Sequence, residues 1–167
     1  ILGSVQDEDL LKKIFSEEKI AIVFHAAAYK HVNLVENNPL TGLKNNILST
    51  ITICRECINK NISAAVLISS DKAVRPTNIM GVSKRVTELI FKSYHYSQKN
   101  NISTIFTIVR FGNVIGSSGS VVPLFKRQIK NGGPITITHP KATRYFMTIK
   151  EASSLVLQSL KMSKGGE

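Results

Sequence analysis

Short apolar runs alternate along this chain with longer stretches of helical periodicity, and this alternation limits the possible folds more than any other feature. Strands are predicted where β-forming residues cluster, at residues 20–24, 64–68 and 104–110. Helices are predicted where apolar side chains recur three or four positions apart, at residues 7–20, 39–60 and 79–98. Smaller elements are predicted further along: a short helix at 121–130, a short strand at 135–138 and a last amphipathic helix at 149–160. Strands joined through helices form parallel βαβ units. We therefore expect an α/β fold with a Rossmann-like, doubly wound parallel sheet.

Three details of the pattern carry further expectations. Residues 20–24 are apolar at all five positions, which predicts a strand buried on both faces. Residues 79–98 present one stripe with Val82 and Leu89 and another face with Met80 and Lys84, which predicts a helix that packs on the sheet and also meets a ligand or a partner. We expect a loop at residues 29–33 and a frayed end at residues 163–167.

Four residues with acid–base or hydrogen-bonding chemistry collect where the second predicted strand ends. Ser70, Asp71 and Lys72 follow this strand directly, and Lys84 lies in the first turns of the helix that comes next. Ligands of open α/β sheets bind at the carboxyl ends of the strands. The alternative for the Ser-Ser-Asp run is a turn or capping cluster, which is common after a strand.

Longer motifs accompany these residues and cover nearly the whole chain. They are an Asn45-Asn46 pair, FHAAAYKHV at 24–32, SSDKAVRPTNIMGVSKR at 69–85, RFGNVIGSSGSVVPL at 110–124, GGPITITHP at 132–140 and TRYFMT at 143–148. Together they closely resemble the CapD-like polysaccharide biosynthesis proteins, which are nucleotide-sugar 4,6-dehydratases of the extended short-chain dehydrogenase/reductase superfamily.

The resemblance implies an enzyme that binds NAD or NADP, with NAD favoured, and acts on a UDP-N-acetylhexosamine such as UDP-N-acetylglucosamine. The implied product is a 4-keto-6-deoxy sugar for surface polysaccharide synthesis. Ser70 would hydrogen-bond the sugar 4-oxygen. Asp71 would protonate the departing C6 hydroxyl if burial raises its pKa, and Lys72 would take the C5 proton if desolvation lowers its pKa. Lys84 would hold the nicotinamide ribose.

Further binding residues follow from the same resemblance. Those implied for the cofactor are Ala26, Ala27, Ala28 and Asn45, with Asn45 or Asn46 steadying the loop at the strand end. Those implied for the substrate are Lys30, His31, Asn113 and Arg144, the last through two oxygens of the diphosphate. The alternative for His31 and Arg144 is an exposed polar residue in a loop. We expect no metal site, because the histidines at 25, 31 and 139 are scattered and lack an acidic partner.

The chain departs from the superfamily pattern in two ways. Met80 stands where the superfamily has the tyrosine of a Tyr-x-x-x-Lys motif, and a thioether cannot carry a proton. The glycine-rich cofactor loop and the first strands are missing, and the chain begins without Met. We therefore expect a partial NAD(P)-binding Rossmann domain at 1–111, a small substrate-binding segment at 112–167, and poor NAD binding and no activity for these residues alone.

The net charge and the cysteines limit which partners and which cellular compartment we expect. The formal net charge of +11 favours an anionic partner such as a phosphorylated small molecule, nucleic acid or a membrane surface. The basic residues form no block, so we expect no nucleic-acid binding. Cys54 and Cys57 are expected to be reduced residues of a helix in a cytoplasmic protein. Two further alternatives are a parent protein on the cytoplasmic face of the inner membrane, with membrane segments before Ile1, and assembly of the chain into a homo-oligomer.

Three other functions compete with the dehydratase. A nucleotide-sugar epimerase would share hydride removal at C4 but would omit the elimination. A non-catalytic nucleotide-sugar binding remnant would explain Met80 and the missing glycine loop. A basic nucleic-acid binder is the weakest alternative, because no platform of aromatic and basic residues is visible.

Overall fold

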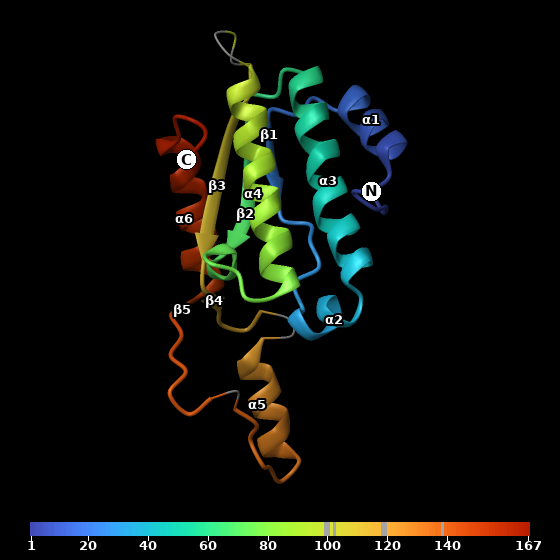
Figure 1. Cartoon of the computed structure of the whole chain (residues 1–167). Helices are drawn as coiled ribbons and strands as arrows, with labels where there is room; N and C mark the ends of the chain where they lie inside the picture. Colours follow the sequence, from blue (N-terminus) through green and yellow to red (C-terminus); the bar gives the residue numbers. More distant parts are fainter. Residues whose placement is uncertain (99–100, 102, 118–119, 138) are drawn as a thin grey trace. The chain divides into compact units, whose positions relative to one another are not determined.

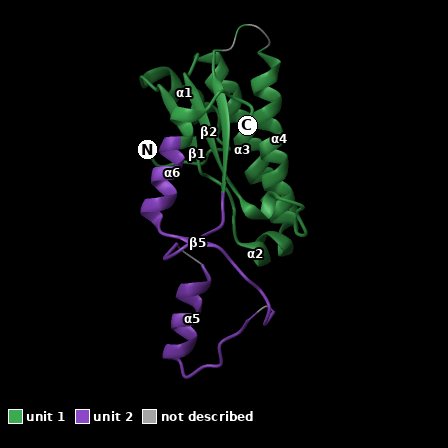
Figure 2. Ribbon diagram, turned by 90° about the vertical axis from the view of Figure 1, so that its left-hand side faces the viewer, with its two compact units in different colours: residues 1–110, 159–167 green, residues 111–158 purple. Residues whose placement is uncertain are grey.

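The computed structural model describes residues 1–98, 101, 103–117, 120–137 and 139–167. By its internal contacts the chain divides into two compact units, residues 1–110 with 159–167, and residues 111–158 (Figure 2). The predicted division of cofactor and substrate binding between residues 1–111 and 112–167 stays a prediction.

The first unit is built on a three-stranded sheet. Its strands are β1 (Ile22–His25), β2 (Ala64–Ser70) and β3 (Ile105–Phe111), in the order β1-β2-β3. β1 and β2 run parallel, with Ile22 opposite Ala64 and His25 opposite Leu67. Figure 1 shows β2 and β3 pointing the same way, so their carboxyl ends meet at one edge. The predicted parallel α/β fold is confirmed.

Two long helices cover one face of this sheet: α3 (Pro39–Asn59) and α4 (Ile79–Ser97) (Figure 1). Both begin where the sequence provides a start signal. Pro39 occupies the first turn of α3, and the side chain of Asn78 accepts a hydrogen bond of 2.8 Å from the N–H of Gly81 in α4. The shorter helix α1 (Glu8–Glu17) is capped in the same way by Asp7 and packs on α3.

The core lies between the sheet and the helices α3 and α4, and it extends to α1. Phe91 of α4 and Phe106 of β3 are fully buried, with ring centroids 5.3 Å apart and an edge-to-face angle of 84°. Of the two faces expected for this helix, the one with Met80 and Lys84 is buried, whereas Val82 and Leu89 on the other are exposed. Four polar side chains can occupy the buried face because each has a hydrogen-bond partner: Ser83, Lys84, Thr87 and Glu88. The exception is His95 farther along α4, whose buried Nδ1 has no partner in the described part of the chain.

Three sequence-based expectations about the first unit are wrong. β1 is an edge strand whose Ile22 and Phe24 are 42% and 43% exposed, because no strand among the described residues covers its outer side. A helix, α2 (Val32–Asn37), begins inside the predicted loop 29–33. The tail at residues 163–167 is not frayed, since Gly166 N–H donates to Phe106 O (2.8 Å) and Ile108 N–H donates to Glu167 O (3.0 Å).

The second unit contains two short parallel strands, β4 (Asn113–Val114) and β5 (Phe146–Met147), the helix α5 (Val121–Lys130) and most of α6 (Ile149–Met162). The helix predicted at 121–130 is confirmed. The strand predicted at 135–138 is absent at residues 135–137, and residue 138 lies outside the described part. Ser118 and Gly119, which belong to the 110–124 motif, also lie outside the described part. None of the described helices is long and apolar enough to cross a membrane.

Candidate functional site

The end of β2 brings three of the predicted catalytic residues together. Ser70 closes the strand and caps the single 3₁₀ turn η1 (Asp71–Ala73), where its Oγ accepts a hydrogen bond of 3.2 Å from Lys72 N–H. The same hydroxyl donates to Asp71 Oδ1 (2.9 Å), and Lys72 Nζ donates to that oxygen as well (3.1 Å). The side chains of Asp71 and Lys72 are 47% and 37% exposed, so a ligand can reach this pair.

The condition expected for Asp71 as an acid is not met. Burial by itself would raise the pKa of Asp71, but the hydrogen bonds from Ser70 and Lys72 and the charge of Lys72 outweigh it and hold the pKa below its ordinary value. A raised pKa, the condition for that role, is therefore absent, because Asp71 and Lys72 form an ion pair within the turn that residue spacing does not reveal. At neutral pH, Asp71 is a carboxylate that can accept a proton.

Lys84 reaches the same end of β2 from α4. Its Nζ donates to Ile68 O at 3.0 Å, two residues before Ser70, and the residue is 8% exposed. Burial lowers the pKa of Lys84 to about 8, with Glu88 opposing this effect. The first turn of α4 can approach this closely because Gly81 has no Cβ, which would collide with the backbone carbonyl of Lys72.

The loop after β1 is fixed by Asn46, which is buried in α3. Asn46 Oδ1 accepts from Tyr29 N–H (2.7 Å), and its Nδ2 donates to Tyr29 O (3.1 Å) and to Ser83 Oγ of α4 (2.9 Å). One amide thus ties residues 26–29 to both helices. Asn45 donates to Asn46 Oδ1 (3.0 Å) and accepts from Gln6 Nε2 (2.8 Å), and its predicted contact with the cofactor stays a prediction.

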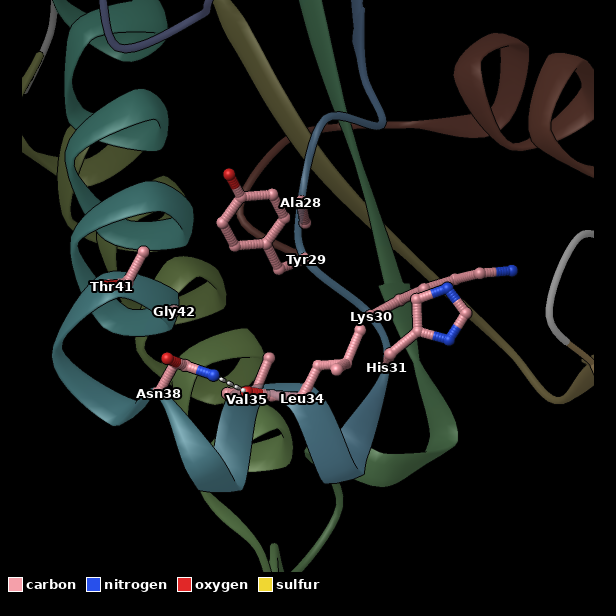
Figure 3. A pocket seen from close by; sticks show the side chains of 9 residues that line it. All are labelled: Ala28, Tyr29, Lys30, His31, Leu34, Val35, Asn38, Thr41 and Gly42. Carbon is pink, nitrogen blue, oxygen red and sulfur yellow. Dashed lines mark hydrogen bonds between the residues drawn. The ribbon is translucent and has the colours of Figure 1, made fainter.

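A pocket of about 470 Å³ opens next to this loop (Figure 3). Its size is within the usual range of small-molecule sites. Figure 3 shows the side chains of Lys30 and His31 extending to the same side of the loop, away from the ring of Tyr29. The lining comes from the loop, α2 and the first turn of α3: Ala28, Tyr29, Lys30, His31, Leu34, Val35, Asn38, Thr41 and Gly42. Three predicted binding residues therefore share one pocket.

His25, the last residue of β1, lies against the inner face of α3. It is buried, its Nε2 lies 3.0 Å from Thr50 Oγ1, and burial together with the charge of Lys84 lowers its pKa to about 4. Thr50 Oγ1 donates to Asn46 O (2.7 Å), so we assign the proton of the imidazole to Nε2. A polar residue every fourth position, as at Asn46 and Thr50, is the signal that marks this inner face of α3.

The predicted substrate residues Asn113 and Arg144 belong to the second unit. Asn113 N–H donates to Tyr145 O (3.1 Å), so β4 places Asn113 beside the segment that carries Arg144. Arg144 is exposed, and its Nη1 donates to Thr143 O (2.7 Å). The other two predicted substrate residues, Lys30 and His31, belong to the first unit.

The residues present fit part of a nicotinamide dinucleotide. Two N–H groups of the buried Lys84 have no hydrogen-bond partner in the described part of the chain, and the small residues Ala26 and Ala27 are exposed directly after β1. Met80 is buried and offers no proton. Among the described residues, no three histidine, cysteine, aspartate or glutamate side chains are grouped to hold a metal ion.

Comparisons with known proteins agree over the full chain. Residues 1–167 match the model of a family described as "Polysaccharide biosynthesis protein". The chain is 48% identical over 167 residues to the capsular polysaccharide biosynthesis protein CapD of Staphylococcus aureus, covering 100% of this chain and 27% of that protein. It is 33% identical to the UDP-N-acetylglucosamine 4,6-dehydratase (inverting) of Campylobacter jejuni, covering 99% of this chain and 49% of that enzyme.

Solved structures share the fold. Pen from Bacillus thuringiensis is 39% identical with a TM-score of 0.90, and the match covers 99% of this chain and 51% of Pen. DesIV, a dTDP-glucose 4,6-dehydratase from Streptomyces venezuelae solved with NAD and TYD bound, has a TM-score of 0.85 at 18% identity, covering 99% and 55% of the two chains. The chain thus spans about half, or less, of the length of the proteins it matches.

Proposed function

Because the chain belongs to the polysaccharide biosynthesis protein family, we propose that it forms part of an NAD(P)-dependent nucleotide-sugar 4,6-dehydratase acting on a UDP-N-acetylhexosamine. The observation that carries this proposal is the meeting of the Ser70–Asp71–Lys72 cluster and the Lys84 amine at one end of β2. The dehydratase names of two relatives and the NAD bound in DesIV support it.

The cofactor would be held by Lys84, through the ribose, and by residues 26–28. When bound, it would accept hydride from C4 of the sugar and later return hydride to C6. Lys30 and His31 would face the sugar, and Asn113 and Arg144 would bind the diphosphate. Most of these residues are accessible: Ala26, Ala27, Lys30, His31 and Arg144 are exposed, and Ala28 and Asn113 are half-buried.

Proton transfer would run through the cluster in two steps. The C4 hydroxyl proton would pass through Ser70 Oγ to the Asp71 carboxylate, since these atoms are joined by a 2.9 Å hydrogen bond. Asp71 would then give this proton to the C6 hydroxyl, which leaves as water. Because its pKa is lowered, Asp71 is ionised at the start and able to receive this proton, and its protonated form is then an acid strong enough to pass the proton to the C6 hydroxyl.

Lys72 would handle the proton at C5. In its neutral form, the half-exposed amine would take the C5 proton, which the C4 ketone has made acidic. It would return this proton to C5 when hydride reaches C6. The protons and electrons then balance, and the net change is loss of one water.

Product analysis tests the proposal. A full-length protein given NAD⁺ and UDP-N-acetylglucosamine should form a product lighter by one water and with a C6 methyl signal in the NMR spectrum. The variants Asp71→Asn and Lys72→Ala should each abolish that product, and Lys44→Ala, which changes an exposed lysine of α3, should not. Full turnover by the Asp71→Asn, Lys72→Ala double variant would refute the mechanism.

A 4-epimerase is the second candidate. It is favoured by the ionised state of Asp71, because epimerisation at C4 needs a deprotonated group for the hydroxyl proton and no acid at C6. In that case the product would keep the mass of the substrate and would gain no methyl group. Binding of UDP-sugar without any turnover would instead support a non-catalytic remnant with Met80 at the tyrosine position.

A further inference from the structure

Glu88, one turn after Lys84 on α4, is a buried carboxylate at the centre of a hydrogen-bond cluster. It is 1% exposed. Its Oε1 accepts from Ser69 Oγ (2.6 Å) and Arg110 Nε (2.7 Å), and its Oε2 accepts from Arg110 Nη2 (2.5 Å) and Arg85 Nη1 (3.0 Å). Four hydrogen bonds satisfy the acceptor sites of a carboxylate.

These bonds tie together the elements that present the candidate site. Ser69 precedes Ser70 at the end of β2, and Arg110 stands near the end of β3, so Glu88 joins both strand ends to α4. The bidentate contact with Arg110 also fixes direction, since two parallel bonds allow little rotation. A small movement of α4 at this point would displace Lys84 from Ile68.

Glu88 is also the anion that acts on Lys84. Burial would raise the pKa of Glu88, but its hydrogen bonds with Arg110, Ser69 and Arg85 outweigh burial and keep it ionised. Its charge opposes the desolvation of Lys84. Two other titratable groups lie around α4. His25 is neutral at pH 7, and Glu36 of α2 accepts a hydrogen bond from the N–H of Ile79, the first residue of α4.

We propose that Glu88 is a positioning residue of this site, which holds Lys84 as a cation and fixes the ends of β2 and β3 against α4. Its effect on turnover rests on the proposed dehydratase function, whereas its effect on Lys84 does not. The charges around Lys84 lead to opposite expectations for two substitutions. Glu88→Gln removes the attracting anion, and Arg110→Gln leaves that anion less neutralised while Arg85 and Ser69 still hold it.

Titration of Lys84 by NMR tests the proposal on the 167-residue chain. Lysine labelled with ¹³C at Cε gives one signal per lysine, and the signal missing from Lys84→Arg assigns Lys84. The pKa of Lys84 should fall in Glu88→Gln and rise in Arg110→Gln. The matched control is Glu56→Gln, which neutralises another buried glutamate on α3 that bonds Asn59, and it should leave the titration unchanged.

A merely structural role would not give shifts of opposite sign. Equal titration of Lys84 in all variants, or shifts in the same direction, would overturn the proposal, and Arg110→Gln decides it alone if Glu88→Gln fails to fold. In a full-length protein that turns over UDP-N-acetylglucosamine, Glu88→Gln should lower kcat by about 10²-fold with little change in KM. Absence of turnover in the native protein would refute the dehydratase and leave the titration result standing.

Discussion

Replacing Lys84 with methionine should stabilise the protein at neutral pH and lose that advantage at alkaline pH. The buried Lys84 has a pKa of about 8 in the folded chain against an ordinary value of 10.5. At about 1.4 kcal/mol per pKa unit, holding the proton in the folded state costs on the order of 3 kcal/mol. This cost is present in full below pH 8, fades as the folded amine loses its proton between pH 8 and 10.5, and is gone above pH 10.5.

Methionine fills a similar volume without a charge but cannot donate a hydrogen bond to Ile68 O. The loss of this bond should lower the stability of the variant by about 1 kcal/mol at every pH. Lys84→Met should therefore be more stable than the native chain by roughly 2 kcal/mol at pH 7 and less stable by about 1 kcal/mol near pH 10.5. Urea unfolding of both proteins at pH 7, 8.5 and 10 measures the difference, in which all other titrating groups cancel.

The control is Lys44→Met, which alters an exposed lysine of α3 and should give a difference that does not depend on pH. A Lys84→Met protein that is less stable than the native chain at pH 7 would contradict the argument. So would a difference that stays constant from pH 7 to 10, since it would mean that the amine keeps its ordinary protonation in the fold.

Three further predictions concern the surroundings of the site. Burial lowers the pKa of His25 to about 4, so the native chain should lose on the order of 3 kcal/mol of unfolding free energy as the pH falls from 6.5 to 4. The His25→Phe variant should lose less stability over the same range, and urea unfolding at each pH measures both. Asn46→Ala should destabilise by about 2 kcal/mol in the same assay because it leaves buried partners unpaired, whereas Asn45→Ala should change stability by less than about 1 kcal/mol. Gly81→Ala should destabilise by roughly 1–3 kcal/mol, measured as a lower Tm, because its Cβ would collide with the Lys72 carbonyl; an unchanged Tm would show that α4 can move away.

The order of strands and helices was predictable because each element carries its own periodicity. The helices at residues 121–130 and 39–60 needed no tertiary information, since their start and stop signals are local. The meeting of Lys84 with the end of β2 was also foreseeable, because parallel strands end at a common edge.

What the sequence left undetermined depends on contacts between distant residues. Hydrophobicity alone gives no reason for α4 to bury Lys84 and Glu88 while Val82 stays exposed; the partners on β2 and β3 decide it. The exposure of β1 likewise depends on which strands lie beside it. The pKa of Asp71 follows from side-chain geometry within the turn, which no spacing in the sequence encodes.

Asp71 and Lys72 are consecutive residues of one three-residue turn, and this has a consequence for motion. Groups carried on separate elements drift apart when those elements shift, whereas neighbours on one turn travel together as a single body. Opening or closing of the molecule around a sugar could change what this pair faces, but it would leave the distance between the carboxylate and the amine almost untouched. Evolution could therefore reshape the surrounding lobes for new sugars without rebuilding this pair.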